Sequence, residues 1–282
     1  MVKVFYNPLA NNKEGLAGAK TIESKVSEDT FEYIDLTKVD DLTQIFKSVS
    51  KEDRIVICGG DGTLNKLVNS VAEEDLPEKI DYYPCGTGND FATELGAKRE
   101  EVVEDIKKYL VSLPTVDVKG KTYKFFNGIG YGIDGYCCEV GDKLRETTTG
   151  KIDYTGIAIK GILFKFKPVT ATVTVDGNTK VYKNCWLTPC MNGKCYGGGM
   201  IPTPGQERLG NPKKLSVMAY HCKSKLKALM VFPNIFKGEH VKVTKVVEIL
   251  EGCNVNVKFD RACALQIDGE TISDVTEFSA RV

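Results

Sequence analysis

The chain has 282 residues, of which 42% are hydrophobic, and its 38 Lys and Arg residues balance its 38 Asp and Glu residues to a formal net charge of zero. This composition excludes a disordered chain and argues against a dedicated nucleic-acid binder, which usually carries a basic surplus. The presence of only two histidines, His221 and His240, argues against zinc sites built from several histidines. The length predicts two domains.

None of the ten cysteines belongs to a CxxC pair. We therefore expect free thiols that pack as small apolar side chains in a reducing compartment. Residues 1–8 show no basic segment followed by an apolar one, and no apolar run approaches the roughly 20 residues of a membrane-spanning helix. These features predict a cytoplasmic protein without a transmembrane segment.

The first third of the chain alternates between strand and helix patterns. Short apolar runs predict strands, and apolar residues at i, i+3, i+4 and i+7 predict helices between them. Such alternation indicates a doubly wound α/β domain, with a mainly parallel sheet and helices on both faces. The predicted strands are 2–6, 31–35, 55–58 and 80–83, and the predicted helices are 16–26, 42–49, 64–71 and 100–113.

After Pro114 the pattern changes to short β-rich runs, with helical patterns only at 154–166 and 224–232. Asp176-Gly177-Asn178 between two of these runs predicts a hairpin. We expect an α/β domain over 1–115 and a β-dominated domain over 116–272, and we leave open a return of 273–282 to the first domain. The predicted strands are 123–129, 169–175, 180–187, 215–220, 241–249, 254–259 and 264–267.

The clearest local signal follows the predicted strand 55–58, where the sequence reads Gly59-Gly60-Asp61-Gly62-Thr63-Leu64-Asn65 and a helix begins. Glycines allow a ligand to approach the backbone amides, and the helix N-terminus favours phosphate. Asp61 would repel phosphate on its own, so we predict that it binds Mg²⁺ placed between carboxylate and phosphate oxygens. The alternative is a tight strand–helix turn in which Asp61 caps a helix.

A second glycine turn, Pro84–Ala92, follows the next predicted strand. Consecutive strands of a parallel sheet bring both turns to one edge, where ligands bind in α/β folds. Thr87 could donate its hydroxyl to phosphate, and Asn89 or Asp90 could cap a helix.

Two other nucleotide-binding motifs are absent from the sequence. Gly120-Lys121-Thr122 is preceded by Thr115 where a Walker A motif requires glycine, and no Gly-x-Gly-x-x-Gly opens a helix after the first strand.

Gly59–Thr63 followed by Gly86-Thr87-Gly88-Asn89-Asp90-Phe91-Ala92 resembles the diacylglycerol kinase catalytic domain, which sphingosine and ceramide kinases share. NAD kinases have the first of these loops but lack the combination. The resemblance extends along nearly the whole chain, through Asn7-Pro8, residues 126–134, Met191-Asn192-Gly193, residues 196–200, residues 232–240 and Gln266–Glu270.

This resemblance implies an N-terminal ATP-binding α/β domain, a C-terminal β-sandwich domain and an active site in the cleft between them. It implies the use of ATP and Mg²⁺, with Asp61 as the magnesium ligand. The nucleotide contacts that it implies are Thr37, Gly59, Gly60, Asp61, Gly62, Thr63, Leu64, Asn65 and Thr87.

The resemblance also gives Asp268 and Glu270 the role of general base toward a lipid hydroxyl. A carboxylate on a tight turn at a strand end suits phosphoryl transfer. Strand alternation would place the two carboxylates on one side of an extended segment. The alternative for Asp268-Gly269 is an ordinary type I′ hairpin.

One segment departs from the family pattern. Many bacterial members carry Asp-Gly before a strand and use the Asp to hold a structural Mg²⁺, whereas this chain has Pro212-Lys213. Proline offers no carboxylate and lysine repels a cation, so we expect this structural magnesium site to be absent.

The segment 154–167 mixes apolar residues with lysines and has two interpretations. It is a membrane-surface helix, or it is a helix packed on the second domain whose lysines extend to water, and the same choice applies to Lys223, Lys225 and Lys227.

Together these features predict an ATP- and Mg²⁺-dependent lipid kinase of phospholipid biosynthesis that converts diacylglycerol to phosphatidate. Two alternatives stay open, namely a kinase of a sphingoid or other lipid-like alcohol and a catalytically silent nucleotide-binding regulator. The expected partner is a lipid at a membrane surface, bound transiently and peripherally. We expect no nucleic acid and leave a homodimer open.

Overall fold

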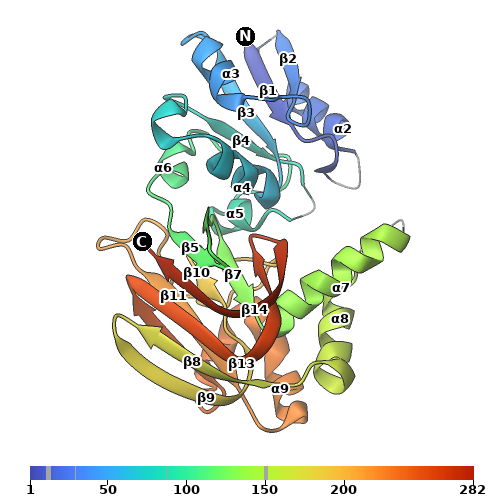
Figure 1. Cartoon of the computed structure of the whole chain (residues 1–282). Coiled ribbons are helices and arrows are strands. Elements are labelled where there is room, and N and C mark those ends of the chain that lie inside the picture. The colour runs from blue at the N-terminus through green and yellow to red at the C-terminus, as the bar shows by residue number, and fades with distance from the viewer. Residues whose placement is uncertain (11–13, 29, 87, 149–151) are drawn as a thin grey trace. The chain divides into compact units, whose positions relative to one another are not determined.

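The computed structural model describes residues 1–10, 14–28, 30–86, 88–148 and 152–282 (Figure 1). The chain divides into two compact units, Met1–Leu113 and Pro114–Val282. The division lies close to the boundary that the sequence predicted after residue 115.

The first unit contains a four-stranded parallel sheet with the strand order β2-β1-β3-β4. The predicted doubly wound α/β architecture of this part is confirmed. The strands are β1 (Val2–Tyr6), β2 (Phe31–Asp35), β3 (Arg54–Gly59) and β4 (Asp81–Pro84). The helices are α2 (Gly15–Lys20), η1 (Thr21–Ser24), α3 (Leu42–Ser48), α4 (Asp61–Ser70), η2 (Glu73–Asp75), α5 (Asp90–Glu94) and α6 (Lys107–Leu110).

The apolar spacing explains how the helices cover this sheet. α4 buries Leu64, Leu67 and Val68, which share one side of the helix because they are three or four residues apart. α3 begins where the Asp41 side chain accepts a hydrogen bond from the Gln44 amide, a standard N-cap.

The predicted helix over 100–113 is wrong, because only α6 is helical there. Glu100 and Asp105 have φ values of 60° and 45°, which no helix allows. The segment instead bonds to the edge of β4, where Val103 and Tyr82 exchange two backbone hydrogen bonds of 2.8 Å. The open edge of β4 thus satisfies backbone groups that the apolar spacing assigned to a helix.

The second unit contains a ten-stranded antiparallel sheet with the order β6-β5-β14-β13-β7-β10-β11-β9-β8, and β12 pairs with β11. Because the long strand β13 pairs with β8 as well as with β7 and β14, the sheet folds back on itself around one core. The strands are β5 (Thr115–Val118), β6 (Lys121–Lys124), β7 (Gly128–Tyr131), β8 (Val169–Val175), β9 (Asn178–Leu187), β10 (Cys190–Met191), β11 (Leu215–His221), β12 (Val247–Gly252), β13 (Asn254–Ile267) and β14 (Glu270–Arg281).

Several strand predictions for this unit need correction. Residues 254–267 form one bulged strand rather than two, and the predicted strand 241–249 begins with a 3₁₀ helix before β12. The possible return of residues 273–282 to the first domain is not observed, because β14 pairs with β13 and β5 and buries Val275, Phe278 and Ala280 in the second unit. The predicted hairpin at Asp176-Gly177 is confirmed, with positive φ at both residues.

The helices of the second unit are α7 (Ile133–Thr147), α8 (Tyr154–Lys160), the π-helix η3 (Gly161–Lys165), α9 (Lys225–Val231), η4 (Phe232–Lys237) and η5 (Glu239–Lys242). The sequence did not predict α7, because its buried side consists largely of glycine and cysteine instead of large aliphatic residues. Gly135 allows this close packing, since a Cβ there would lie 1.9 Å from the Ala264 carbonyl oxygen of β13. Within the described residues, no helix is long and apolar enough to cross a membrane.

Candidate active site

The two glycine turns of the first unit lie side by side at the carboxyl ends of β3 and β4, as predicted. Backbone hydrogen bonds join them: the Cys85 amide donates to the Gly59 carbonyl at 3.0 Å, and the Asp61 amide donates to the Gly88 carbonyl at 3.3 Å. The turn after β3 leads directly into α4, which begins at Asp61.

Glycine is required where these turns touch. A Cβ on Gly60 would lie 2.5 Å from the Gly88 carbonyl oxygen, and one on Gly86 would lie 2.4 Å from the Gly60 Cα. Gly62 differs, because it is exposed and no atom lies within 4 Å of the position of its Cβ. The surface at Gly62 in the first turn of α4 is therefore open to a ligand. A helix N-terminus favours a phosphate group.

Asp61 has both carboxylate oxygens engaged within this pair of turns. Oδ2 accepts a hydrogen bond from the Asp90 amide at 2.8 Å, and Oδ1 accepts one from the Phe91 amide at 3.0 Å. These amides open α5, so Asp61 caps that helix from the start of α4, with its side chain buried. The contacts fit the capping alternative. Because each oxygen accepts one hydrogen bond and can accept more, the role of Asp61 as a magnesium ligand stays a prediction.

The other predicted nucleotide contacts of the first unit fall into three groups. Gly59, Thr63 and Leu64 are buried, and Leu64 belongs to the core. Asn65 is half-buried in the second turn of α4. Thr87 lies outside the described residues.

Thr37 follows β2 at the same carboxyl edge of the sheet. Its amide and its hydroxyl both donate to Asp35 Oδ1, at 2.9 and 2.7 Å. This bonding, led by the Thr37 hydroxyl, lowers the pKa of Asp35. The Thr37 hydroxyl thus serves the local turn in this structure.

In the second unit, Asp268 and Gly269 form the two-residue turn between β13 and β14. Both have positive φ, 47° and 95°, and Ile267 pairs with Glu270 across the turn. This is the type I′ geometry that Asp-Gly favours. The prediction that Asp268 and Glu270 lie on one side of an extended segment is wrong, because the chain reverses between them.

The Asp268 carboxylate accepts hydrogen bonds from three consecutive amides, those of Phe126, Asn127 and Gly128. The Asn127 and Gly128 distances are 2.7 and 2.9 Å. Three donors favour the ionised form of a carboxylate and fix its position. Glu270 is exposed at the start of β14.

A buried polar network holds the segment that binds Asp268. Asn192 Nδ2 and the Arg208 guanidinium both donate to the Phe126 carbonyl, and Arg208 also donates to Asn127 Oδ1 at 2.7 Å. Gln206 donates to the Asn192 carbonyl at 3.1 Å. The sequence quoted Asn127 and Asn192 only within resemblance motifs, and nothing in its pattern distinguished Gln206 or Arg208.

Gln266 connects the turn to a second buried acid. Its Oε1 accepts from the Gly269 amide at 2.7 Å, and its Nε2 donates to Asp134 Oδ2 at 2.8 Å. Burial raises the pKa of Asp134 to about 6, although the hydrogen bond from Gln266 acts in the opposite direction. Burial thus favours the neutral form of the Asp134 carboxyl group.

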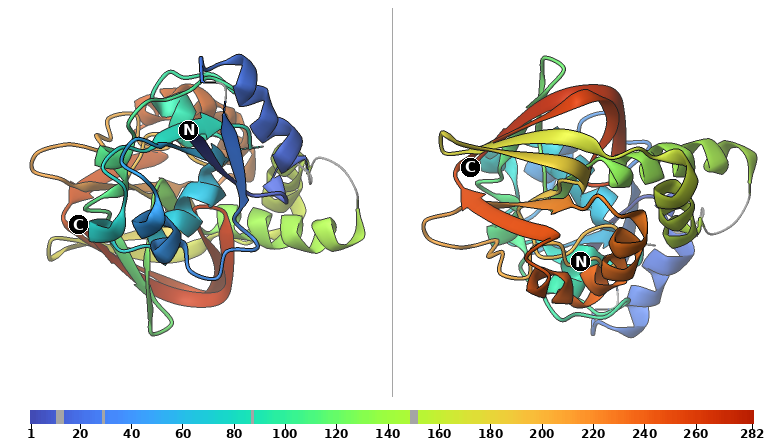
Figure 2. Two further views of the ribbon diagram at one scale, coloured as in Figure 1. Left: turned by 90° about the horizontal axis from the view of Figure 1, so that it is seen from above. Right: turned by 90° about the horizontal axis from the view of Figure 1, so that it is seen from below.

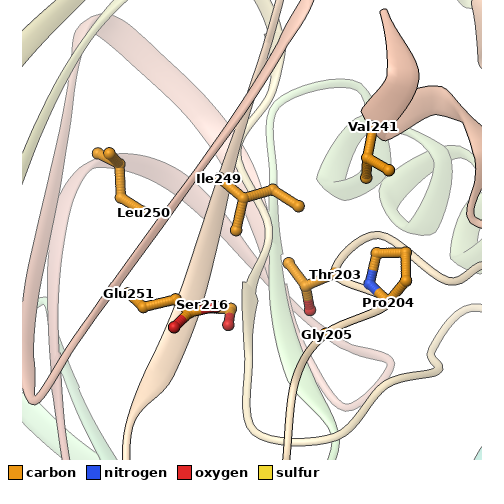
Figure 3. Close-up of a pocket in the computed structure, with 8 residues that line it drawn as sticks. All are labelled: Thr203, Pro204, Gly205, Ser216, Val241, Ile249, Leu250 and Glu251. Carbon is orange, nitrogen blue, oxygen red and sulfur yellow. The ribbon is translucent and has the colours of Figure 1, made fainter. Parts of the chain in front are cut away.

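A cavity of about 480 Å³ lies beside this network in the second unit (Figure 3). Ser216 lines it and donates to Gln206 Oε1 at 2.6 Å, which joins the cavity wall to the network. None of the predicted site residues lines it. The lining residues are Thr203, Pro204, Gly205, Ser216, Val241, Ile249, Leu250 and Glu251.

Comparison with known proteins identifies the family of this chain. Residues 1–118 match the model described as diacylglycerol kinase catalytic domain, and residues 127–280 match the YegS C-terminal NAD kinase beta sandwich-like domain. The chain belongs to the diacylglycerol kinase catalytic-domain family. The predicted architecture of an α/β domain followed by a β-rich domain is that of this family, whose members are kinase-type enzymes.

Individual relatives agree with this assignment. YtlR of Bacillus subtilis (strain 168) is 26% identical over 267 residues, which cover 85% of this chain and 84% of YtlR. A diacylglycerol kinase of Mycobacterium tuberculosis (strain H37Rv) is 27% identical over 228 residues, 76% of this chain and 72% of that protein. A crystal structure of a diacylglycerol kinase from Bacillus anthracis shares the fold, with a TM-score of 0.64 and 20% identity over 99% of this chain and 93% of that one.

The family resemblance implies ATP and Mg²⁺, and the described residues fit these two groups to different degrees. The open first turn of α4 fits the phosphates of ATP. No cluster of three or more His, Cys, Asp or Glu side chains able to hold a metal ion occurs among the described residues, and the Asp61 oxygens serve α5. We therefore assign no magnesium ligand, and the predicted absence of a site at Pro212-Lys213 stays a prediction.

Proposed function

We propose that this protein transfers the γ-phosphate of ATP to the hydroxyl of a membrane lipid, with diacylglycerol as the acceptor and phosphatidate as the product. The observation that carries the proposal is the open N-terminus of α4 beside two touching glycine turns, in a chain of this kinase family. Phosphoryl transfer needs mainly positioning and charge stabilisation, which such a backbone surface can provide.

In this proposal the glycine turns bind the nucleotide and Asp61 holds their shape. The Gly62 amide at the start of α4 faces the phosphate oxygens, since the Asp61 and Thr63 amides on either side of it donate to the Gly88 and Gly60 carbonyls. Asp61 acts as a positioning residue, because its contacts with Asp90 and Phe91 fix the second turn against the first.

A carboxylate of the second unit would accept the proton that the lipid hydroxyl releases. The lipid hydroxyl oxygen bonds to the γ-phosphorus, the bond to the β–γ bridging oxygen breaks, and the hydroxyl proton passes to a carboxylate. Asp268 is a weak proton acceptor while three amides donate to it. We therefore propose that the exposed Glu270 takes the proton and that Asp268 fixes the turn that presents it.

Transfer of labelled phosphate from ATP to a panel of lipids in mixed micelles tests the acceptor. We expect labelled phosphatidate from diacylglycerol and little product from sphingosine or ceramide. A preference for a sphingoid base would show that the protein is a sphingoid kinase and would rule out diacylglycerol as its main acceptor. ATP binding without transfer to any lipid would favour the silent regulator and contradict the proposal.

A further inference from the structure

One surface of the second unit exposes large apolar side chains on three neighbouring helical elements. Phe164 of η3 is 75% exposed, Leu226 and Met230 of α9 are 67% and 63% exposed, and Ile159 of α8 is 42% exposed. Exposed single apolar residues are common, but several large ones on adjacent elements indicate a contact surface. We call these four residues the apolar face.

Local geometry explains why these side chains face water. α9 buries Ala228 and Val231 against the core, while Leu226 and Met230, four residues apart, share its other side. η3 buries Gly161 and Ile162. Gly161 allows close contact with α7, because a Cβ there would lie 2.9 Å from a ring carbon of Tyr136.

The elements that carry the apolar face are joined to one another. Lys225 Nζ of α9 donates to the Leu163 carbonyl of η3 at 2.9 Å. Lys225 directly precedes Leu226 in the chain, and Leu163 directly precedes Phe164. The ribbon views show α9 beside the end of η3 (Figures 1 and 2). The exposed residues of η3 and α9 therefore occupy neighbouring positions.

The charge around the apolar face is entirely positive along these segments. Residues 154–167 and 223–237 contain seven lysines and no aspartate or glutamate: Lys160, Lys165, Lys167, Lys223, Lys225, Lys227 and Lys237. Nearby acids on α7 have partners of their own, since Glu139 pairs with Lys143 at 3.4 Å and Asp142 pairs with Arg145 at 2.9 Å. Within the described ranges, no carboxylate forms an ion pair with any of the seven lysines.

We propose that the apolar face and these lysines bind the surface of an anionic lipid bilayer. The apolar side chains would enter the boundary between head groups and acyl chains, and the lysines would contact the negative head groups. Two segments that contain seven lysines and no acid match the uniform negative charge of such a bilayer. The proposal rests on the proposed function only in that a lipid kinase must reach an acceptor held in a membrane.

The interpretation of residues 154–167 as a helix packed on the second unit is confirmed, and the membrane-surface interpretation becomes part of this proposal. One side of α8 and η3 packs on the second unit through Ala158 and Ile162, and the other side exposes Ile159 and Phe164.

Co-sedimentation with vesicles tests the proposal. The full chain should bind phosphatidylcholine vesicles that contain phosphatidylglycerol, bind pure phosphatidylcholine less, and dissociate as salt concentration rises. Phe164→Ser with Leu226→Ser should lower partitioning at least about tenfold. Lys160→Gln with Lys165→Gln and Lys227→Gln should lower it on the order of 100-fold on anionic vesicles.

Matched variants outside the surface provide the controls. Val181→Ser on β9, where Val181 is 60% exposed, and Lys121→Gln on β6 should bind vesicles like the unaltered protein. All variants should keep the melting temperature and the transfer of phosphate to short-chain diacylglycerol dispersed in detergent.

Three results would overturn the proposal: no binding of the unaltered protein to anionic vesicles, equal binding by the surface variants, or a dimer that Phe164→Ser with Leu226→Ser converts to a monomer, which would assign the face to a second copy. Failure of the transfer to dispersed diacylglycerol would contradict the proposed function instead, and leaves the vesicle result to be judged separately.

Discussion

Asp61 accepts hydrogen bonds from two consecutive amides at the start of α5, one through each carboxylate oxygen. Asp268 likewise accepts from three consecutive amides before and within β7. In both cases a carboxylate that the sequence associated with chemistry fixes a backbone segment. The residues to which the proposed function assigns contact with substrate are their neighbours, the open Gly62 and the exposed Glu270.

Asp61→Ala should therefore affect structure and nucleotide binding together. Loss of a helix cap costs about 1 kcal/mol, and two unpaired buried amides add to this, so we expect a destabilisation of about 2 kcal/mol and weaker ATP binding. Chemical denaturation and calorimetry measure the two effects. Unchanged stability combined with a lost dependence on Mg²⁺ would restore Asp61 as a metal ligand.

Asp134→Asn should change the pH dependence of stability. Because burial raises the pKa of Asp134 from 3.8 to about 6, the folded chain binds more protons than the unfolded chain between these values. The stability that Asp134 contributes is therefore fully present below about pH 4 and is lost as the pH rises through about 6. The corresponding change in the free energy of unfolding is on the order of 2–3 kcal/mol.

Urea unfolding across that pH range should show a flatter profile for Asp134→Asn than for the unaltered protein. Asp260→Asn, at an exposed aspartate of the same unit, is the control. Identical slopes for the unaltered protein and Asp134→Asn would show that Asp134 does not titrate in this range.

At the scale of elements, the strands β3 and β4 carry a different feature at each end. The glycine turns follow their carboxyl ends, while Arg54 and Asp81 at their amino ends form an ion pair of 2.7 Å. Asp81 is buried and also accepts from the Asp105 amide at 2.9 Å. One end of the strand pair thus carries the proposed nucleotide site, and the contacts at the other end stabilise the sheet.

Two glycine variants separate packing from ligand approach. Gly86→Ala forces a Cβ against the Gly60 backbone and should destabilise the first unit by about 2 kcal/mol. Gly62→Ala meets no atom and lies in α4, so it should stabilise the helix by about 0.5–1 kcal/mol and yet weaken ATP binding about tenfold by covering the amides. Thermal unfolding and ATP titration of both variants distinguish these effects. Unchanged ATP affinity of Gly62→Ala would show that the phosphates do not bind at the start of α4.

Asp81→Ala should destabilise the first unit by about 2 kcal/mol, because the Asp105 amide loses its acceptor and Arg54 loses its buried partner, while Arg54 keeps its ion pair with Glu28 at 3.0 Å. Denaturant unfolding measures the loss. The affinity for ATP of the folded fraction should not change, since Asp81 lies at the opposite ends of the strands from the glycine turns, and a selective loss of ATP binding would contradict this separation.

At the scale of the molecule, the sequence predicted the features that depend on local pattern. Apolar runs and glycine turns located β1 to β4, the helices α3 and α4, and the adjacent turns after β3 and β4. The pattern failed where distant partners decide the structure. Residues 100–106 bond to the edge of β4, α7 packs through glycines, and Arg208 becomes important through its contacts with Phe126 and Asn127, which are distant in the sequence.

The most direct test compares Glu270→Gln and Asp268→Asn with the unaltered protein in the transfer of labelled γ-phosphate to diacylglycerol in mixed micelles, with ATP affinity measured on the same samples. The account predicts transfer by the unaltered protein and a loss of kcat of about 100-fold or more for Glu270→Gln at unchanged ATP affinity. Asp268→Asn should lose kcat through a displaced turn and should also lower the melting temperature, while its ATP affinity stays unchanged. Absence of transfer by the unaltered protein, or full activity of Glu270→Gln, would contradict the account.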